Sequence, residues 1–281
     1  MERSAVRVAF GFSSEVSVGE KTGIEWTDST WNPATGCTQV TRGCDNCYAL
    51  TLAHRRLREV YLARVPANNI AENRTDPFAV RLWPERLEQP RKWRSPRMVF
   101  VNSMSDLFHA DIPDSFVRSV FEVMLEVDRH VYQVLTKRPS RAARFCRKNT
   151  DLFPDGVVPP HIWMGTSVED QQVDYRVRHL RTVPAAVRFL SCEPLLAPLD
   201  LDLEDIDWVI VGGESGHGFR PMELEWARHI RDQCQMFGAP FFFKQIGGFT
   251  PKAGGRLLDG VEWNEMPRCV DTSSERKFAL V

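Results

Sequence analysis

The sequence lacks any apolar segment close to the roughly 20 residues that a membrane-spanning helix needs. The first 20 residues also lack the pattern of a secretory signal peptide, because the apolar run Val6–Phe12 is too short and no cleavage site follows it. We therefore expect a cytoplasmic protein with no membrane partner, in which residues 1–22 form a disordered or extended leader.

An excess of charge of one sign is also missing. The chain has 36 Lys and Arg residues and 37 Asp and Glu residues, a net charge of −1, so no overall field attracts nucleic acid. Basic residues are nevertheless clustered, which predicts a local basic surface, although a single run is more typical of a solvated helix face. The clusters are Arg55, Arg56 and Arg58; Arg91, Lys92, Arg94 and Arg97; and Lys137, Arg138, Arg141, Arg144, Arg147 and Lys148.

The cysteine pattern excludes a disulfide framework. The seven cysteines are an odd number, they are scattered along the chain, and no export signal accompanies them. Reduced thiols are therefore expected, and a close group of cysteines would serve metal or redox chemistry.

No low-complexity linker separates a second domain. Short apolar runs alternate with amphipathic stretches, the pattern of a parallel sheet covered by helices. With an earlier strand near Ile24–Trp26, they predict an α/β fold, a partial or near-complete (β/α) barrel of about six to seven parallel strands over residues 23–245. We expect residues 246–281 to form an extension packed on this barrel. The runs are Met98–Val101, Val131–Leu135, His161–Met164, Val187–Leu190, Trp208–Val211 and Pro240–Phe243.

Helices are expected between these runs. Apolar residues at spacings of three and four predict helices over residues 50–64, 116–127, 173–180 and 226–237. The Pro-rich connection over residues 193–207 predicts no full helix.

Each apolar run ends in small polar or charged residues. In a β/α barrel the carboxyl ends of the strands share one rim, where active sites lie. Polar loops alone would not require carboxylates, a lysine and paired glycines at successive strand ends, so the pattern predicts an active site at this rim. The segments are 102–106, 136–138, 165–167, 191–193, 212–215 and 244–245.

Three cysteines lie close together in "GCTQVTRGCDNCYA", within an expected loop at residues 36–48. Cys37, Cys44 and Cys47 have C-x6-C-x2-C spacing, and thiolates are the natural ligands of zinc and of iron–sulfur clusters. Three cysteines without a fourth ligand in the loop favour a four-iron cluster with one open iron. The alternatives are a zinc site completed by His54 or Cys192, and a group of buried, unligated thiols.

Further segments carry a resemblance to a known family. They are "IEWTDSTWNPATGCTQVTRGCDNCYA", "VFVNSMSDLFH", "LTKRP", "GTSVED", "SCEPLL", "VGGESG" and "RLLDGVEW". The chain resembles the radical S-adenosylmethionine (SAM) superfamily and, more narrowly, the phage-associated three-Cys-motif family, from about Gly23 to Pro267. The spacing departs from the common radical SAM pattern, which has three residues between the first two cysteines.

The resemblance implies an enzyme with a [4Fe–4S] cluster on Cys37, Cys44 and Cys47. The reduced cluster would cleave SAM to methionine and a 5′-deoxyadenosyl radical. It also implies a rim pocket that positions SAM. The candidate contacts are Tyr48, Asn102, Ser103, Ser105, Asp106, Lys137, Gly212, Gly213 and Glu214. We expect Asp106 to face the SAM ammonium, Lys137 or Arg138 to pair with the SAM carboxylate, and the two glycines to let a ligand approach the backbone.

Cys192 and Glu193 are the candidate catalytic residues, because both belong to the strand end of "SCEPLL". A cysteine at the rim is a candidate hydrogen-atom donor to a substrate radical. The basic runs suggest a phosphate-bearing or nucleic-acid substrate at the barrel mouth. The expected partners are a flavodoxin- or ferredoxin-like electron donor, nucleic acid and a partner protein.

Two other classes of protein fit parts of the sequence. One is a zinc-bearing nucleic-acid-binding protein without radical chemistry, which the basic clusters favour. The other is a hydrolase with a structural metal that uses Asp106, Glu193 and Glu214. Iron–sulfur proteins absorb visible light, so colour would separate the radical SAM interpretation from both.

Overall fold

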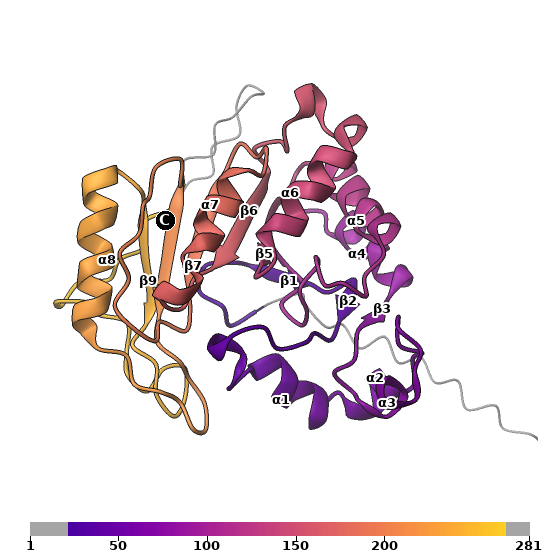
Figure 1. The fold of residues 1–281 in the computed structure, drawn as a ribbon, viewed down its shortest axis with the longest axis horizontal. Helices are drawn as coiled ribbons and strands as arrows, with labels where there is room; N and C mark the ends of the chain where they lie inside the picture. The colour runs from indigo at the N-terminus through magenta and orange to yellow at the C-terminus, as the bar shows by residue number, and fades with distance from the viewer. Residues whose placement is uncertain (1–21, 268–281) are drawn as a thin grey trace, which may run out of the picture.

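A seven-stranded parallel sheet forms the centre of the molecule (Figure 1). The computed structural model describes residues 22–267. Within them the strand order β1-β4-β5-β6-β7-β8-β9 follows the chain, and every neighbouring pair is parallel. The strands are β1 (Ser29–Trp31), β4 (Met98–Val101), β5 (Val131–Thr136), β6 (Ile162–Ser167), β7 (Arg188–Cys192), β8 (Trp208–Gly212) and β9 (Phe241–Gln245). The predicted α/β fold is confirmed, as a curled half-barrel.

The remaining elements surround this sheet. A small antiparallel pair joins β2 (Ala34–Thr35) to β3 (Arg81–Leu82). The α-helices are α1 (Tyr48–His54), α2 (Arg58–Leu62), α3 (Ala71–Thr75), α4 (Gln89–Lys92), α5 (Asp114–Glu126), α6 (Pro139–Lys148), α7 (Tyr175–Arg181) and α8 (Leu224–Phe237). The 3-10 helices are η1 (Arg42–Cys44), η2 (Pro84–Glu88), η3 (Thr150–Leu152), η4 (Pro154–Gly156) and η5 (Gln171–Val173).

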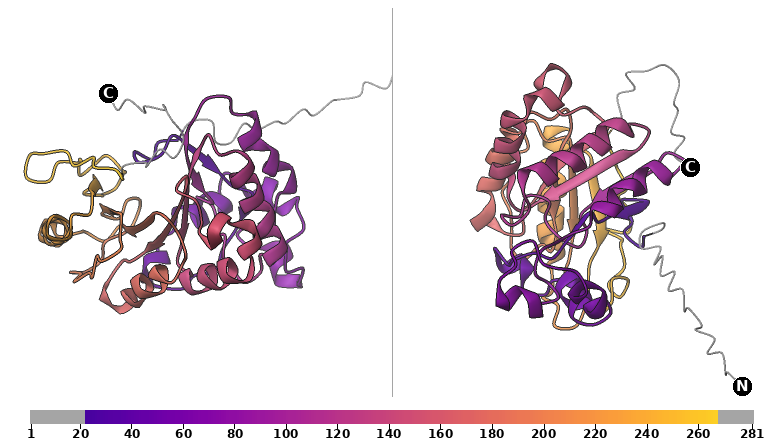
Figure 2. Two further views of the ribbon diagram at one scale, coloured as in Figure 1. Left: turned by 90° about the horizontal axis from the view of Figure 1, so that it is seen from above. Right: turned by 90° about the vertical axis from the view of Figure 1, so that its right-hand side faces the viewer.

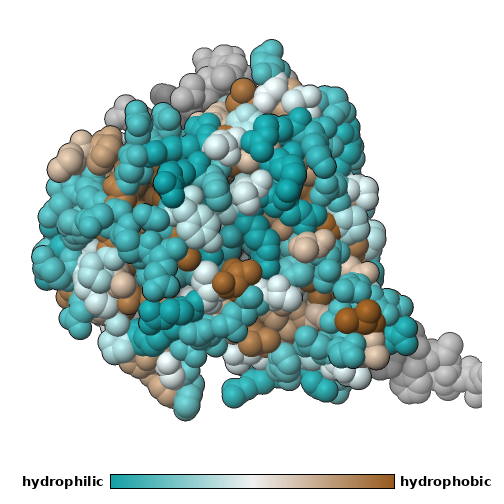
Figure 3. Space-filling view, in the orientation of Figure 1, coloured by the Kyte–Doolittle hydropathy of each residue, from teal (hydrophilic) through white to brown (hydrophobic). Residues whose placement is uncertain are grey.

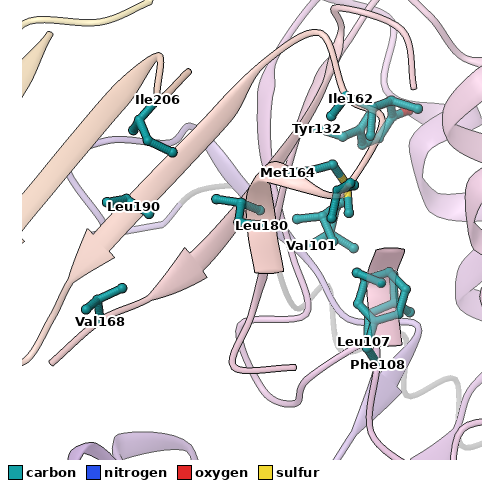
Figure 4. Close-up of a cluster of buried hydrophobic side chains, with 14 of the residues drawn as sticks. Val101, Leu107, Phe108, Tyr132, Ile162, Met164, Val168, Leu180, Leu190 and Ile206 are labelled. Atoms are coloured by element: carbon teal, nitrogen blue, oxygen red, sulfur yellow. The ribbon is translucent and has the colours of Figure 1, made fainter. Parts of the chain in front are cut away.

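Helices cover the outer face of the curved sheet (Figure 2). Side chains alternate along each strand, so one set faces these helices and the next set faces the inside of the curl. The outer set forms the main core, in which Tyr132, Met164 and Leu190 come from neighbouring strands and pack near Leu180 of α7 (Figure 4). Burial of this core is the main force that holds the helices on the sheet.

Aromatic side chains fill the inside of the curl. Trp26 lies between two strands that are well separated in the sheet, with its ring centroid 4.7 Å from Phe100 of β4 and 6.3 Å from Trp208 of β8. Gly165 of β6 leaves room for Phe189, because a Cβ at this glycine would lie 2.4 Å from the Phe189 ring. The inner cluster contains Trp26, Phe100, Val131, Trp163, Val187, Phe189, Trp208, Ile210 and Phe242.

Two predicted elements differ from the structure. The first strand is Ser29–Trp31 rather than Ile24–Trp26, because a turn in which Thr27 N donates to Ile24 O sends Trp26 into the interior. The helix expected over residues 50–64 is two helices, α1 and α2, separated by residues 55–57. The connection over residues 193–207, all of it described, contains no helix, as predicted.

The segment after β9 packs on the last strands of the sheet. Phe243 N donates to Trp263 O at 2.9 Å, and the Trp208 indole donates to Glu265 O at 2.8 Å. The expected leader, except residue 22, and the end of the expected extension, residues 268–281, lie outside the described residues. In the described part, no helix is long and apolar enough to cross a membrane. The face in Figure 3 is mostly hydrophilic, with hydrophobic residues in small separate groups.

Candidate active site

A cavity of about 480 Å³ lies at the carboxyl ends of the parallel strands. Residues that end or follow β4, β5, β7, β8 and β9 line it, together with the three clustered cysteines. Of the predicted site residues, Cys37, Cys44, Cys47, Tyr48, Asn102, Ser103, Ser105, Asp106, Lys137, Glu193, Gly213 and Glu214 line this cavity. The strand-end pattern therefore located the pocket.

Cys192 and Gly212 are not among the lining residues. Cys192 is fully buried in the outer core, close enough to Cys234 for the two thiols to influence each other. Burial raises the pKa of the Cys192 thiol well above its usual value. The strand alternation explains this placement, since Ser191 and Glu193 line the cavity and the residue between them faces the helices. The structure therefore gives no support to Cys192 as a hydrogen-atom donor.

Backbone contacts fix the start of the cysteine loop. Gly36 N donates to Met104 O at 2.9 Å, and Cys37 N donates to Phe78 O at 3.0 Å. Gly36 has a φ of 85°, and a Cβ there would lie 2.3 Å from Ala79 O, so only glycine fits at this crossing. Cys44 ends η1, and Cys47 precedes the first residue of α1.

Asp106 connects the first cysteine to the end of β5. Its carboxylate accepts hydrogen bonds from Thr136 Oγ1 at 2.7 Å, Lys137 N at 3.0 Å and Phe108 N at 2.9 Å. Arg138 Nη1 lies 2.8 Å from the same carboxylate and 3.8 Å from Cys37 Sγ. Four donors thus satisfy Asp106, which was expected to face the SAM ammonium.

Glu169 holds the middle of the cysteine loop. Its buried carboxylate lies 3.2 Å from Lys137 Nζ and 3.0 Å from Arg176 Nη1, and it accepts a hydrogen bond from Thr41 Oγ1. A Cβ on Gly43 would lie 2.8 Å from this carboxylate, so the loop passes directly over it. Glu169 was not among the predicted site residues, although it belongs to the segment "GTSVED". Its ion pair with Lys137 was likewise not predicted.

Glu214 holds the end of the cysteine loop. Its Oε1 lies 2.6 Å from Arg220 Nη2, and its Oε2 accepts from Asn46 Nδ2 at 2.9 Å. Arg220 also lies 2.9 Å from Asp45 and donates to Arg42 O at 2.9 Å. Like Asp106, Glu214 is occupied by protein donors and serves to position the loop.

The two glycines before Glu214 have packing roles. A Cβ on Gly213 would lie 1.9 Å from Ile246 O, so the segment after β9 occupies that space. A Cβ on Gly212 would lie 2.6 Å from Glu193 Oε1, because the Glu193 side chain passes over β8. The structure therefore explains both glycines by close packing within the chain rather than by approach of a ligand.

Glu193 and Lys244 form an ion pair in the cavity. Their Oε1 and Nζ atoms are 3.0 Å apart, and Ser191 Oγ lies 3.3 Å from Glu193 Oε2. The two residues follow or end strands on either side of β8, so the pair spans the inner face at the rim. Lys244 was not singled out by name, although the segment at 244–245 was expected at the rim.

Three buried polar side chains on the cavity wall each have at least one polar atom without a hydrogen-bond partner among residues 22–267. They are Trp26 through its indole nitrogen, Asn102 through both amide atoms, and Gln245 through Oε1. An unsatisfied buried polar group costs about 1–3 kcal/mol. These atoms are therefore where a ligand would gain most from polar contact.

The three cysteine side chains are half-buried, and Cys44 lies close enough to Cys37 and Cys47 for an electrostatic interaction with each. Burial raises the pKa of Cys37 to about 11, and the neighbouring Asp106 adds to this rise. Burial likewise raises the pKa of Cys47, and a charge on Cys44 would raise the pKa of both. Within residues 22–267, no three His, Cys, Asp or Glu side chains are arranged to hold a single metal ion. The three thiols line one cavity, and thiolates are the ligands that iron–sulfur clusters and zinc use.

The basic runs were expected at the mouth of the barrel, but the structure places only part of them there. The run at 91–97 directly precedes β4 and so lies at the amino ends of the strands. The run at 137–148 begins at the cavity, and then follows α6 toward those amino ends, as a crossover helix must. Within that run Lys137 and Arg138 line the cavity, and Arg138 donates to Thr38 O of the cysteine loop at 3.3 Å. The run at 55–58 lies between α1 and α2.

Comparison with known families matches most of the chain. The family described as "Protein of unknown function (DUF5131)" matches residues 21–267. The chain belongs to the DUF5131 family. No curated protein matches its sequence.

Solved structures of spore photoproduct lyase are similar at low identity. The lyase complexed with dinucleoside spore photoproduct is 12% identical, with a TM-score of 0.43 over 78% of this chain and 64% of that chain. A double mutant with bound AdoMet and dinucleoside spore photoproduct is also 12% identical, with a TM-score of 0.44 over the same shares. This DUF5131 chain thus spans 64% of the length of these structures.

Proposed function

We propose that this protein is a radical SAM enzyme whose [4Fe–4S] cluster is held by Cys37, Cys44 and Cys47. The observation that carries the proposal is that all three cysteines line one cavity at the carboxyl ends of the parallel strands. All of the sequence segments that carry the resemblance, except "RLLDGVEW", contribute residues to the lining of the same cavity. When bound, a reduced cluster of this type supplies the electron that cleaves SAM to methionine and a 5′-deoxyadenosyl radical.

In this proposal the protein's own residues keep the cysteine loop in one shape. Asp106, Glu169 and Glu214 attach its beginning, middle and end to three different parts of the barrel. Each of these carboxylates is itself paired with an arginine, so the loop is held without leaving a buried charge unpaired. Preorganisation of this kind lowers the cost of assembling a metal centre.

The inside of the half-barrel would protect a reactive intermediate from water. Aromatic side chains close the inner face below the cavity, and Trp26 bridges β4 and β8. Exclusion of water from such a site prevents side reactions.

Within the cavity, Glu193 remains the proposed catalytic carboxylate, and the structure adds Lys244 as its partner. An ion pair at the rim provides one group that accepts a proton and one that donates it. Tyr48, Ser103 and Ser105, which lie next to the cysteine loop, remain proposed contacts of SAM. A flavodoxin- or ferredoxin-like protein is the proposed electron donor.

The test is SAM cleavage by the anaerobically reconstituted protein. With dithionite as reductant, we expect release of 5′-deoxyadenosine, and loss of that release in Cys37→Ala, Cys44→Ala and Cys47→Ala. Cys146→Ala is the matched control, because this thiol lies in the outer core and does not line the cavity. Protein that carries its full iron content but releases no 5′-deoxyadenosine would contradict the proposal.

A further inference from the structure

Asn102 has a fixed backbone and a free side chain. It follows β4 with a φ of 63°, in the left-handed region that asparagine tolerates better than most residues. Its N donates to Trp31 O at 2.8 Å, and its O accepts from Ser105 N at 3.2 Å. The side chain is only 2% exposed, it lines the cavity, and neither amide atom has a partner among the described residues.

The chemistry of this amide restricts its ligand. The Asn102 amide presents a donor and an acceptor side by side in one plane. A ligand that satisfies both must present an acceptor and a donor at the same spacing on one edge. The edge of a heterocyclic base has this pattern, and asparagine pairs with bases in this way.

Two further buried side chains add neutral hydrogen-bonding groups to the same cavity. Trp26, 3% exposed, offers an unpartnered indole N–H. Gln245, 5% exposed, donates from Nε2 to Gly213 O at 3.0 Å and offers an unpartnered Oε1. Each of the three groups is uncharged, so together they suit a neutral, polar ligand better than an ion.

Apolar side chains supply a surface for a flat ring. Phe100 and Leu135, from the neighbouring strands β4 and β5, line the same cavity, and the Phe100 ring centroid lies 4.7 Å from that of Trp26. Flat apolar contact combined with a few placed hydrogen-bonding groups is typical of a site for a small aromatic ligand.

We propose that Asn102, Trp26 and Gln245 bind a heterocyclic base carried by the substrate, so that the substrate is a nucleoside, a nucleotide or a nucleic acid. The proposal rests on the proposed function only in assigning the base to a substrate. The adenine of SAM has the same chemistry, and the experiment must separate these two sources.

The test is calorimetric titration of the reconstituted holoprotein with adenosine, guanosine, cytidine, uridine and thymidine, in the presence of saturating SAM. Ribose serves as the ligand without a base. We expect one nucleoside site per chain and no ribose binding. Asn102→Gly removes the amide but keeps the positive φ without strain, and Gln245→Met removes the acceptor at similar volume. Each should weaken nucleoside binding about tenfold or more.

Asp205→Gly is the matched control, because Asp205 has a φ of 58° and lies in the connection before β8. Nucleoside binding should be unchanged in this variant. The proposal is overturned if no nucleoside binds beside SAM, or if both cavity variants bind it as the unsubstituted protein does. It is also overturned if nucleosides only compete with SAM and the variants weaken SAM equally, since the site would then belong to the cofactor.

Failure of this inference is distinguishable from failure of the proposed function. The same samples are assayed for 5′-deoxyadenosine. Release without nucleoside binding overturns the base site alone, whereas nucleoside binding without release leaves the base site and contradicts radical SAM chemistry.

Discussion

Arg176 and Glu169 form an ion pair that is closed to solvent. Arg176 Nη1 lies 3.0 Å from Glu169 Oε2, and the two side chains are 1% and 0% exposed. Lys137 Nζ lies 3.2 Å from the same oxygen, and Thr41 of the cysteine loop donates to the other. The buried charge of Glu169 therefore joins the cysteine loop to α7 and to the residue that follows β5.

Glu169→Gln should destabilise the protein by about 3–5 kcal/mol, because it leaves the buried Arg176 and the partly buried Lys137 without their common partner. Urea unfolding of the two proteins measures this difference. Glu122→Gln is the control, since Glu122 forms an exposed pair with Arg118 and should change the free energy of unfolding by less than about 1 kcal/mol. Equal effects of the two substitutions would show that the Glu169 pair does not hold the fold.

Stability should also depend on the protonation of Glu169. Burial alone would raise its pKa, but Lys137 and Arg176 outweigh burial and hold the pKa below its ordinary value. The unfolded chain therefore binds more protons, so this contribution is present above the unfolded pKa of about 4.3 and is lost as pH falls through the folded pKa. Between about pH 3 and pH 7, the free energy of unfolding should rise less steeply with pH in Glu169→Gln than in the unsubstituted protein. Parallel curves would contradict the assignment.

Gly213→Ala tests the packing role of this glycine. The new Cβ would lie 1.9 Å from Ile246 O, a backbone atom, so the segment after β9 must move. We expect a loss of about 1–3 kcal/mol in unfolding free energy, as for other overpacked sites. Gly23→Ala is the control, because nothing lies within 4 Å of a Cβ at that position. A free energy of unfolding equal to that of Gly23→Ala would contradict this account.

Local patterns in the sequence predicted the sheet and the position of the cavity. Strands that are apolar on both faces, such as Trp208–Gly212, are recognisable without knowledge of their neighbours. The residues after them, such as Glu193 and Gly213, meet at one rim because the strands are parallel. Trp26 was wrongly predicted to lie in a strand, because a turn, and not its apolar character, directs its side chain into the interior.

The partners of the charged residues could not be predicted. Asp106 and Glu214 were expected to meet a ligand, but the structure pairs them with Arg138 and Arg220. Glu169 reaches Thr41, which is 128 positions away in the sequence. Such pairings depend on how strand ends curl toward one another, and residue type and spacing carry no record of that geometry.

The most direct test of the account is the iron and acid-labile sulfide content of the anaerobically reconstituted protein, measured with its visible absorbance spectrum. The account predicts about four irons and about four sulfides per chain, a brown chromophore, and loss of all three when Cys37, Cys44 and Cys47 are replaced by alanine. One zinc per chain with no chromophore would contradict it, because the cysteine loop would then be a structural metal site.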